Sequence, residues 1–131
     1  MKIIVKNNAF EINNICAVIN SICVQKNTQI DFTNEIKTCV KEMLQNCLYH
    51  SQSETIDVDI DVNEDGINIK VKDFGIGIED IEKALQPMYS TCDKEERAGL
   101  GFTIMEVFAD SLSVKNNEDK GLTVEMFKKW E

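Results

Sequence analysis

Four stretches of the chain alternate between apolar and polar residues with the period of two that marks half-buried β-strands. In residues 55–62 the apolar residues hold the even positions, and aspartates hold the odd positions from 57 to 61. After an Asn-Glu-Asp-Gly turn, residues 67–71 resume the alternation, and residues 111–115 and 122–128 flank a second polar turn. The pattern predicts two antiparallel hairpins, each with one buried face.

Other stretches repeat apolar residues every three or four positions, which predicts helices. The strongest of these is 32–50, with Asp31 as its expected N-cap, and 11–24 and 101–110 follow the same period. A short helix is expected over 79–86, where early acids suit the positive helix N-terminus.

The order of the elements predicts the fold class. Residues 2–6 are expected to form a strand and residues 87–98 an irregular charged segment. Hairpins build a mostly antiparallel, mixed sheet, and the helices must cover one face of it. The expected fold is therefore α+β, a two-layer α/β sandwich, in a single domain over residues 1–131. The strand–helix alternation of a parallel dinucleotide-binding sheet is missing.

Composition narrows the function classes. The chain is 43% hydrophobic and 28% charged, which is ordinary for a folded domain and argues against disorder. No run approaches the roughly 18 apolar residues that a membrane helix needs, and the start lacks the apolar stretch of a signal peptide. A net charge of −9 disfavours nucleic-acid and membrane partners. We expect a cytoplasmic protein.

Five cysteines and one histidine invite a metal or redox interpretation. The cysteine count is odd and no two have Cys-x-x-Cys spacing, so reduced thiols packed as small apolar groups are favoured over a reactive role for Cys92. His50 is expected to pack at the edge of its helix rather than to accept a phosphoryl group.

Three short segments carry residues suited to nucleotide chemistry. Residues 73–77, Asp-Phe-Gly-Ile-Gly, follow a strand, and residues 97–102, Arg-Ala-Gly-Leu-Gly-Phe, precede a helix. Glu42 and Asn46 lie four apart on one helix edge. Taken singly, each has a plain explanation: a turn, a glycine-rich helix entry that could expose N–H groups to a phosphate, and two solvated side chains. The Gly-Lys-Ser/Thr of a P-loop is absent.

Together these segments resemble the GHKL or Bergerat-type ATP-binding family, also described as histidine-kinase-like ATPases. Glu42-x-x-x-Asn46-x-x-x-His50 resembles its N box, residues 73–77 its first glycine box and residues 99–101 its second. Gly121-Leu122-Thr123 is similar to the Gly-x-Thr of its late strand.

Within that family the chain most resembles the anti-sigma factor serine kinases of spore-forming bacteria. The similar stretches are 86–91 and 96–106, and the lid is short, with Gly77 and Gly99 separated by 22 positions. Departures are Ser51 after the N-box histidine, Ser90-Thr91-Cys92 without a lysine, and residues 11–24 without a basic residue.

The resemblance implies a role for each residue at the base of the nucleotide. Asp73 would accept a hydrogen bond from the adenine amino group, and Thr123 would support adenine binding nearby. Gly75 and Gly77 would let the backbone pass close to the base.

At the phosphates, the resemblance implies that Asn46 holds Mg²⁺ and that Arg97 neutralises the terminal phosphate. Glu42 would accept the proton of the attacking serine hydroxyl. Backbone N–H groups for the phosphates would come from Gly99, Leu100 and Gly101.

The implied function is an ATP-dependent protein serine kinase that is also an anti-sigma factor. It would use ATP/ADP and Mg²⁺, bind a sigma factor and phosphorylate a serine on an anti-anti-sigma protein of the STAS type, as a homodimer through residues 2–6 or the first helix. A nucleotide-dependent partner-switching module without transfer is the alternative. The catalytic fragment of a sensor histidine kinase ranks below both, because no dimerisation helices with an acceptor histidine are evident.

Overall fold

The computed structural model describes residues 1–79, 81–85 and 93–131, with the backbone alone for 83, 84 and 93–100. The strands are β1 (Lys2–Lys6), β2 (Thr55–Val62), β3 (Gly66–Asp73), β4 (Ser111–Asn116) and β5 (Leu122–Lys129). The helices are α1 (Ala9–Gln25), α2 (Ile30–Asn46), the π-helix η1 (Cys47–Ser51), α3 (Ile81–Ala84) and α4 (Asp93–Phe108).

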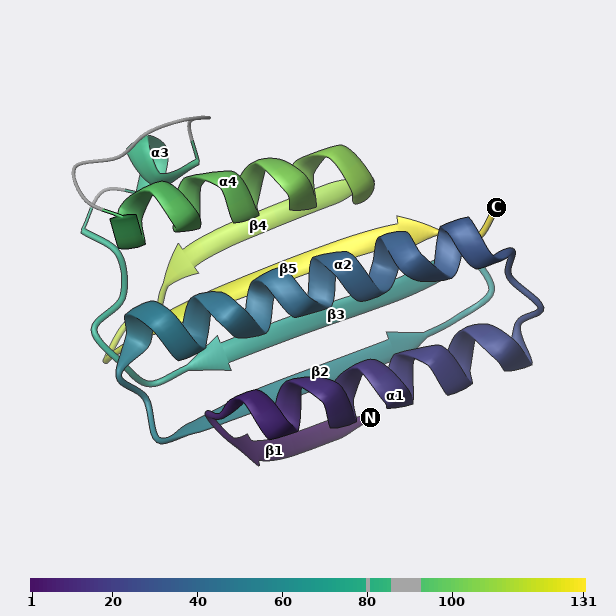
Figure 1. The fold of residues 1–131 in the computed structure, drawn as a ribbon, viewed down its shortest axis with the longest axis horizontal. Coiled ribbons are helices and arrows are strands. Elements are labelled where there is room, and N and C mark those ends of the chain that lie inside the picture. Colours follow the sequence, from purple (N-terminus) through teal and green to yellow (C-terminus); the bar gives the residue numbers. More distant parts are fainter. Residues whose placement is uncertain (80, 86–92) are drawn as a thin grey trace.

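The strands form one sheet in the order β1-β2-β3-β5-β4 (Figure 1). Both predicted hairpins are present, as β2–β3 and β4–β5. β1 and β5 add to the two sides of the first hairpin, and every pairing between described strands is antiparallel. The mixed component that we expected is therefore missing from this sheet.

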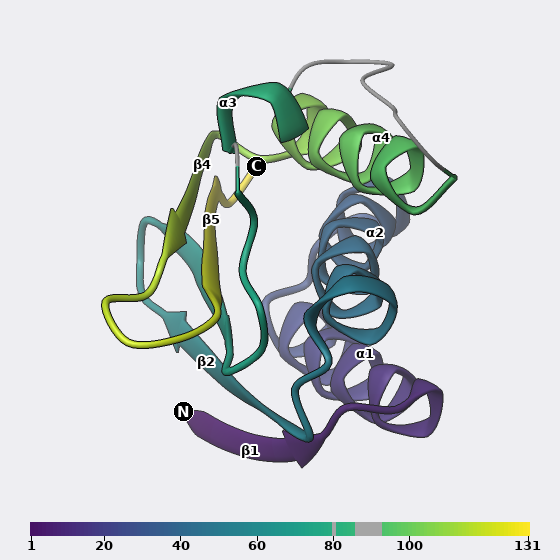
Figure 2. The same ribbon diagram turned by 90° about the vertical axis from the view of Figure 1, so that its left-hand side faces the viewer.

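Helices cover one face of the sheet, as predicted, and the core lies between the two layers (Figure 2). The strand alternation supplies the lower half of that core. Val58, Val71, Val124 and Val114 lie opposite one another in a row across four strands. From the helix layer, Ile15, Ile36 and other apolar residues of α1 and α2 close the core from above.

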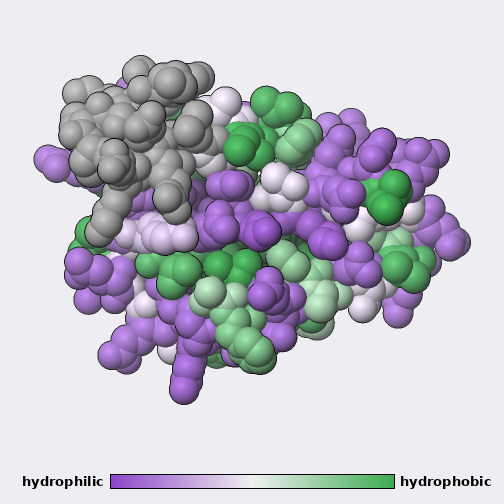
Figure 3. Space-filling model, in the orientation of Figure 1, coloured by the Kyte–Doolittle hydropathy of each residue, from purple (hydrophilic) through white to green (hydrophobic). Residues whose placement is uncertain are grey.

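The solvent side of the helices is mostly hydrophilic (Figure 3). Apolar groups also show on this face, and α1 carries two exposed apolar side chains, Phe10 and Val24, at 70% and 66% exposure. None of the helices in the described ranges has both the length and the apolarity needed to cross a bilayer.

The long second helix differs from its prediction at both ends. It begins at Ile30 with Gln29 as N-cap, so Asp31 lies in the first turn and the predicted cap is wrong. The Glu131 carboxylate accepts a hydrogen bond from the backbone N–H of Gln29 at 2.9 Å and so places a negative charge at the helix N-terminus. At the other end the α-helix stops at Asn46 and a π-helical turn follows.

Competing donors explain the change to a π-helix. The carbonyl of Cys47 accepts from the Asn7 Nδ2 at 2.9 Å and from the Ser51 hydroxyl at 3.0 Å. Because these side chains take that carbonyl, the chain widens there and ends in a left-handed residue, Gln52, with φ of 61°.

The last helix starts earlier than predicted. Residues 87–98 were expected to be irregular, yet α4 begins at Asp93, while α3 is shorter than the expected 79–86. Residues 93–98 read Asp-Lys-Glu-Glu-Arg-Ala, which combines strong helix formers with acids near the N-terminus. These propensities override the two glycines that we took as the helix entry.

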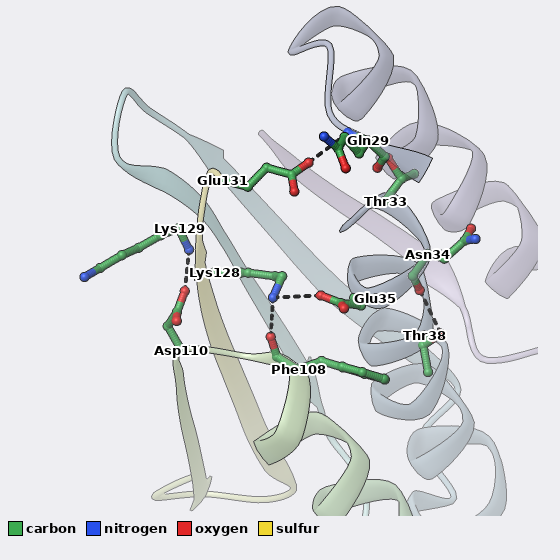
Figure 4. A network of polar contacts seen from close by, with 10 residues as sticks. All are labelled: Gln29, Thr33, Asn34, Glu35, Thr38, Phe108, Asp110, Lys128, Lys129 and Glu131. Carbon is green, nitrogen blue, oxygen red and sulfur yellow. Dashed lines mark hydrogen bonds and ion pairs between the residues drawn. The ribbon is translucent and has the colours of Figure 1, made fainter. Parts of the chain in front are cut away.

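One lysine fastens the C-terminal end of α4 to the rest of the fold (Figure 4). Lys128 on β5 donates to the carbonyl of Phe108 at 2.6 Å and pairs with the Glu35 carboxylate of α2 at 3.1 Å. The ammonium also lies 5.1 Å from the centre of the Phe32 ring. The Lys128 side chain is only 12% exposed, whereas the Glu35 side chain is 37% exposed, so the lysine is largely withdrawn from water and its carboxylate partner is not.

Replacing Lys128 with methionine is expected to lower the free energy of unfolding by about 1–3 kcal/mol. Methionine keeps much of the apolar stem but leaves the Phe108 carbonyl and the Glu35 carboxylate without this donor. Urea denaturation measures the effect. Lys129→Met is the matched control, because Lys129 contributes its backbone N–H to Asp110 and that N–H survives the substitution. Equal stability of the two variants would contradict the anchoring role.

Candidate functional site

A pocket opens where the end of α2 and the π-turn η1 face the ends of β3 and β5. It encloses about 390 Å³, including its open mouth. It is lined by Met43, Asn46, Cys47, His50, Ser51, Val71, Asp73, Gly77, Ile78, Leu122 and Val124. Most of its wall is apolar, with a few polar groups set into it, which is the usual build of a small-molecule site.

Asp73 places a buried carboxylate in this pocket. The alternation of β3 directs Ile67, Ile69, Val71 and then Asp73 toward the helices, and Asp73 is only 3% exposed. Its Oδ1 accepts from the N–H of Gly75 at 3.0 Å and of Leu122 at 3.1 Å. These bonds hold the carboxylate at the end of the strand, where the resemblance expected it.

The thiol of Cys47 reaches the other oxygen of that carboxylate. Its Sγ lies 3.7 Å from Asp73 Oδ2, within range for a weak S–H donor. Burial, followed by the neighbouring Asp73 charge, raises the pKa of the Cys47 thiol well above its usual value, so the thiol is protonated at neutral pH. The prediction that the described cysteines are free, packed thiols is confirmed for Cys16, Cys23, Cys39 and Cys47.

The turn between β4 and β5 supports Asp73 from behind. Asn117 Nδ2 donates to the Asp73 carbonyl at 2.9 Å. The Thr123 hydroxyl in turn bonds to Asn117 Oδ1 and does not line the pocket. Any support of a base by Thr123 is therefore indirect, and Leu122 is the residue of this motif that faces the pocket.

Close packing within the chain requires glycine at both positions of the first glycine box. A Cβ on Gly75 would lie 1.6 Å from the carbonyl oxygen of Ser51, and that oxygen accepts the N–H of Ile76. Gly77 has φ of +73°, and a Cβ there would meet Asn116 Oδ1 at 2.5 Å. Gly75 thus permits the close approach of η1, while Gly77 shapes the pocket wall.

Asn46 carries an unsatisfied amide into the pocket. The side chain is 8% exposed, and its Nδ2 has no hydrogen-bond partner among the described residues. Because the two ends of an amide can be exchanged in assignment, the group presents either a donor or an oxygen to a ligand. His50 also lines the pocket, brought there by the π-turn.

Glu42 lies one turn before Asn46 but does not line the pocket. A Cβ on Gly101 of α4 would lie 2.9 Å from Glu42 Oε2 and 3.6 Å from Asn46 Oδ1. The missing side chain of Gly101 therefore lets α4 pack closely over both N-box residues, and the structure brings the N box and the second glycine box together.

The expected phosphate cradle does not sit at a helix N-terminus. Gly99, Leu100 and Gly101 lie within α4, where N–H groups beyond the first turn bond to carbonyls four residues back. Arg97 belongs to the same helical stretch. The lid residues 86–92, including Cys92, lie outside the described residues.

Sequence reasoning missed three residues of this site. Cys47, Leu122 and Asn117 each contact Asp73, by a thiol, a backbone N–H and a side-chain amide. The apolar stripe of α2 placed Cys47 on the core face, and its position next to Asn46 was the available signal. Ser51, one of the departures from the family pattern, closes the π-turn through its hydroxyl.

Comparison with known proteins adds independent information. The family described as "Histidine kinase-like ATPase domain" matches residues 5–128. The chain is 38% identical over 115 residues to an anti-sigma F factor of Clostridium perfringens (strain ATCC 13124), covering 85% of this chain and 82% of that protein. It is 40% identical over 114 residues to an anti-sigma F factor of Thermoanaerobacter sp. (strain X514), covering 85% and 80%.

A solved structure shares the fold. A chain in the crystal structure of the SiaB-SiaC complex from Pseudomonas aeruginosa superimposes with a TM-score of 0.68. The match covers 98% of this chain and 89% of that one at 14% identity, so it speaks for the architecture alone.

Proposed function

The chain belongs to the family of histidine kinase-like ATPase domains, and from that premise we propose that it is an anti-sigma factor and an ATP-dependent protein serine kinase. It would bind a sigma factor and phosphorylate a serine of a STAS-type anti-anti-sigma protein in the cytoplasm. The relatives named anti-sigma F factor support this assignment. A homodimer through β1 or α1 stays a prediction.

One observation carries the nucleotide part of the proposal: a buried carboxylate and an unsatisfied amide share an apolar-walled pocket. Asp73 offers an acceptor to an exocyclic amine, and Met43, Val71 and Leu122 offer flat apolar contact to a purine ring. Asn46 Nδ2 lacks a partner that a bound ligand would supply. These residues fit an adenine nucleotide.

The residues around the N box would contact the phosphates of the bound nucleotide. The amide oxygen of Asn46 is a suitable hard ligand for Mg²⁺. When bound, magnesium-ATP supplies the phosphoryl group that is transferred. Glu42 would accept the proton of the substrate serine Oγ, and Arg97 would neutralise phosphate charge, since such reactions depend mainly on positioning and electrostatics.

We assign phosphate contacts to Gly99, Leu100 and Gly101, which requires α4 to begin later than Asp93 when the nucleotide is bound. Backbone N–H groups become available to an anion only in the first turn of a helix. Glycines favour such a rearrangement because they are poor helix formers.

A second candidate is a nucleotide-dependent switch that does not transfer phosphate. Glu42 faces Gly101 of α4 and does not line the pocket, which favours binding without chemistry. Incubating the purified chain with γ-labelled ATP, Mg²⁺ and a STAS protein encoded beside it separates the two candidates. Label on a serine of the STAS protein supports the kinase, and nucleotide-dependent complex formation without label supports the switch.

Asp73→Asn is expected to weaken ATP binding by about 10- to 100-fold, because a hydrogen bond to a charged group contributes about 1.5–3 kcal/mol. Asparagine can keep its oxygen on the Gly75 and Leu122 N–H groups, but it turns a donor toward the amine of the base. Isothermal titration calorimetry measures the loss.

The control is Asp65→Asn, in the exposed β2–β3 turn away from the pocket. It should bind ATP as tightly as the unmodified chain. Unchanged affinity in Asp73→Asn would refute the base assignment.

A further inference from the structure

We propose that Cys47 is a specificity-determining residue for the base: its side chain limits the size of the group that the exocyclic amine of an adenine nucleotide can carry. The inference rests on the proposed nucleotide function and adds to it a residue outside the motifs. Three features of the described structure lead to it: the different donors to the two Asp73 oxygens, the position of the Cys47 sulfur, and the Asn46 amide without a hydrogen-bond partner.

The two oxygens of Asp73 are occupied differently. Oδ1 accepts from two backbone N–H groups, of Gly75 and Leu122, at 3.0 and 3.1 Å. Oδ2 has the Cys47 thiol as its hydrogen-bond neighbour, at the longer distance of 3.7 Å. A strong donor on a ligand therefore finds its acceptor in Oδ2, since a sulfur donor is weak and leaves lone pairs available.

The sulfur stands beside that acceptor inside the pocket. Cys47 is 4% exposed and follows Met43 by one helical turn, so both line the same wall. A nitrogen bonded to Oδ2 at about 2.9 Å would share this oxygen with the sulfur. An amine with only hydrogens can approach this oxygen beside the sulfur, whereas an alkyl group directed at Cys47 meets the sulfur.

The residue next to Cys47 supports a ligand at this wall. Asn46 precedes Cys47, is more than nine-tenths buried, and has its Nδ2 without a hydrogen-bond partner among the described residues. Asn46, Cys47 and Asp73 all line the same pocket, so the sulfur borders the space that a ligand of the amide and the carboxylate would fill. The position of Cys47 thus makes its size a property of the binding site.

The test compares ATP with N6-methyl-ATP, which differs by one methyl group on the exocyclic amine. The unmodified chain is expected to bind ATP at least about tenfold more tightly than the methylated analogue. One methyl group changes binding by about this factor or more in a close-fitting pocket. Cys47→Ala removes the sulfur and should reduce that ratio to about threefold or less. Calorimetry measures both affinities.

Two variants control for packing. Cys39→Ala removes the same atom at a fully buried site in the preceding helix α2, outside the pocket, and it should leave the ratio at the unmodified value. Cys47→Ser keeps a donor of similar size beside Asp73 and should also keep the ratio. Thermal unfolding of each variant reports the stability change separately from the binding change.

The outcomes are distinct. If the unmodified chain binds no ATP, the proposed function itself fails. If ATP binds but Cys47→Ala discriminates against the methyl group as strongly as before, the inference about Cys47 is overturned while the proposed function stands. Equal weakening of both nucleotides by Cys47→Ala would mark a merely structural residue and would also overturn it.

Discussion

Replacing Glu42 with glutamine is expected to slow phosphoryl transfer to a serine substrate by about 100- to 10,000-fold, the usual contribution of a general base. ATP binding should stay nearly unchanged, because the base pocket and Asn46 are left intact. Glutamine has the shape of glutamate, so the close packing of the side chain against Gly101 is preserved. Single-turnover transfer of labelled phosphate, with ATP affinity measured in parallel, separates chemistry from binding.

Glu106→Gln is the matched control for this experiment. Glu106 lies on α4 and is exposed, so the same chemical change there should leave both transfer and binding as they were. Full transfer by Glu42→Gln would show that Glu42 is not the base. Equal loss in the two variants would point to surface charge as the cause.

Gly121→Ala is expected to lower the free energy of unfolding by about 2–4 kcal/mol, from backbone strain and steric overlap together. Gly121 has φ of +93°, which alanine adopts only at a cost. Its Cβ would lie 2.1 Å from the carbonyl oxygen of Asp73 and 2.8 Å from Oδ1. Urea denaturation measures the stability.

The same substitution should weaken ATP binding, because relief of the overlap must displace Asp73 or the turn that holds it. Lys120→Ala is the control, since Lys120 offers only its backbone carbonyl to Asn117 and keeps it after substitution. A Gly121→Ala variant with the stability and affinity of Lys120→Ala would refute the strain at this position.

The helix-on-sheet architecture and the position of Asp73 at the end of β3 could be predicted because both depend on short-range periodicity. Alternation in β2 and β3 assigns each side chain to a face, and continuing it by one step buries Asp73. The spacing of α2 likewise places Cys47 inward and Asn46 at the edge. Such assignments need only local geometry, and the structure confirms both hairpins.

The errors arose where something other than hydrophobic periodicity decides the local structure. The π-turn exists because Asn7, some 40 positions away, donates to the Cys47 carbonyl. The early start of α4 reflects a balance between helix-forming residues at 93–98 and glycines at 99 and 101. The indirect position of Thr123 depends on Asn117 in the preceding turn. Periodicity contains none of this information.

Because Lys128 holds α4 at Phe108, a tilt of the helix about this fixed end moves its other end most. Gly101 lies seven residues from Phe108, or about 10 Å along the helix axis. A tilt of about ten degrees about Phe108 would therefore move Gly101, which packs on the N box, by nearly 2 Å, given the helical rise of 1.5 Å per residue. A tilt of this size, with the clamped end at rest, would change the distance between Gly101 and the Glu42 carboxylate, which now leaves no room for a Cβ on Gly101.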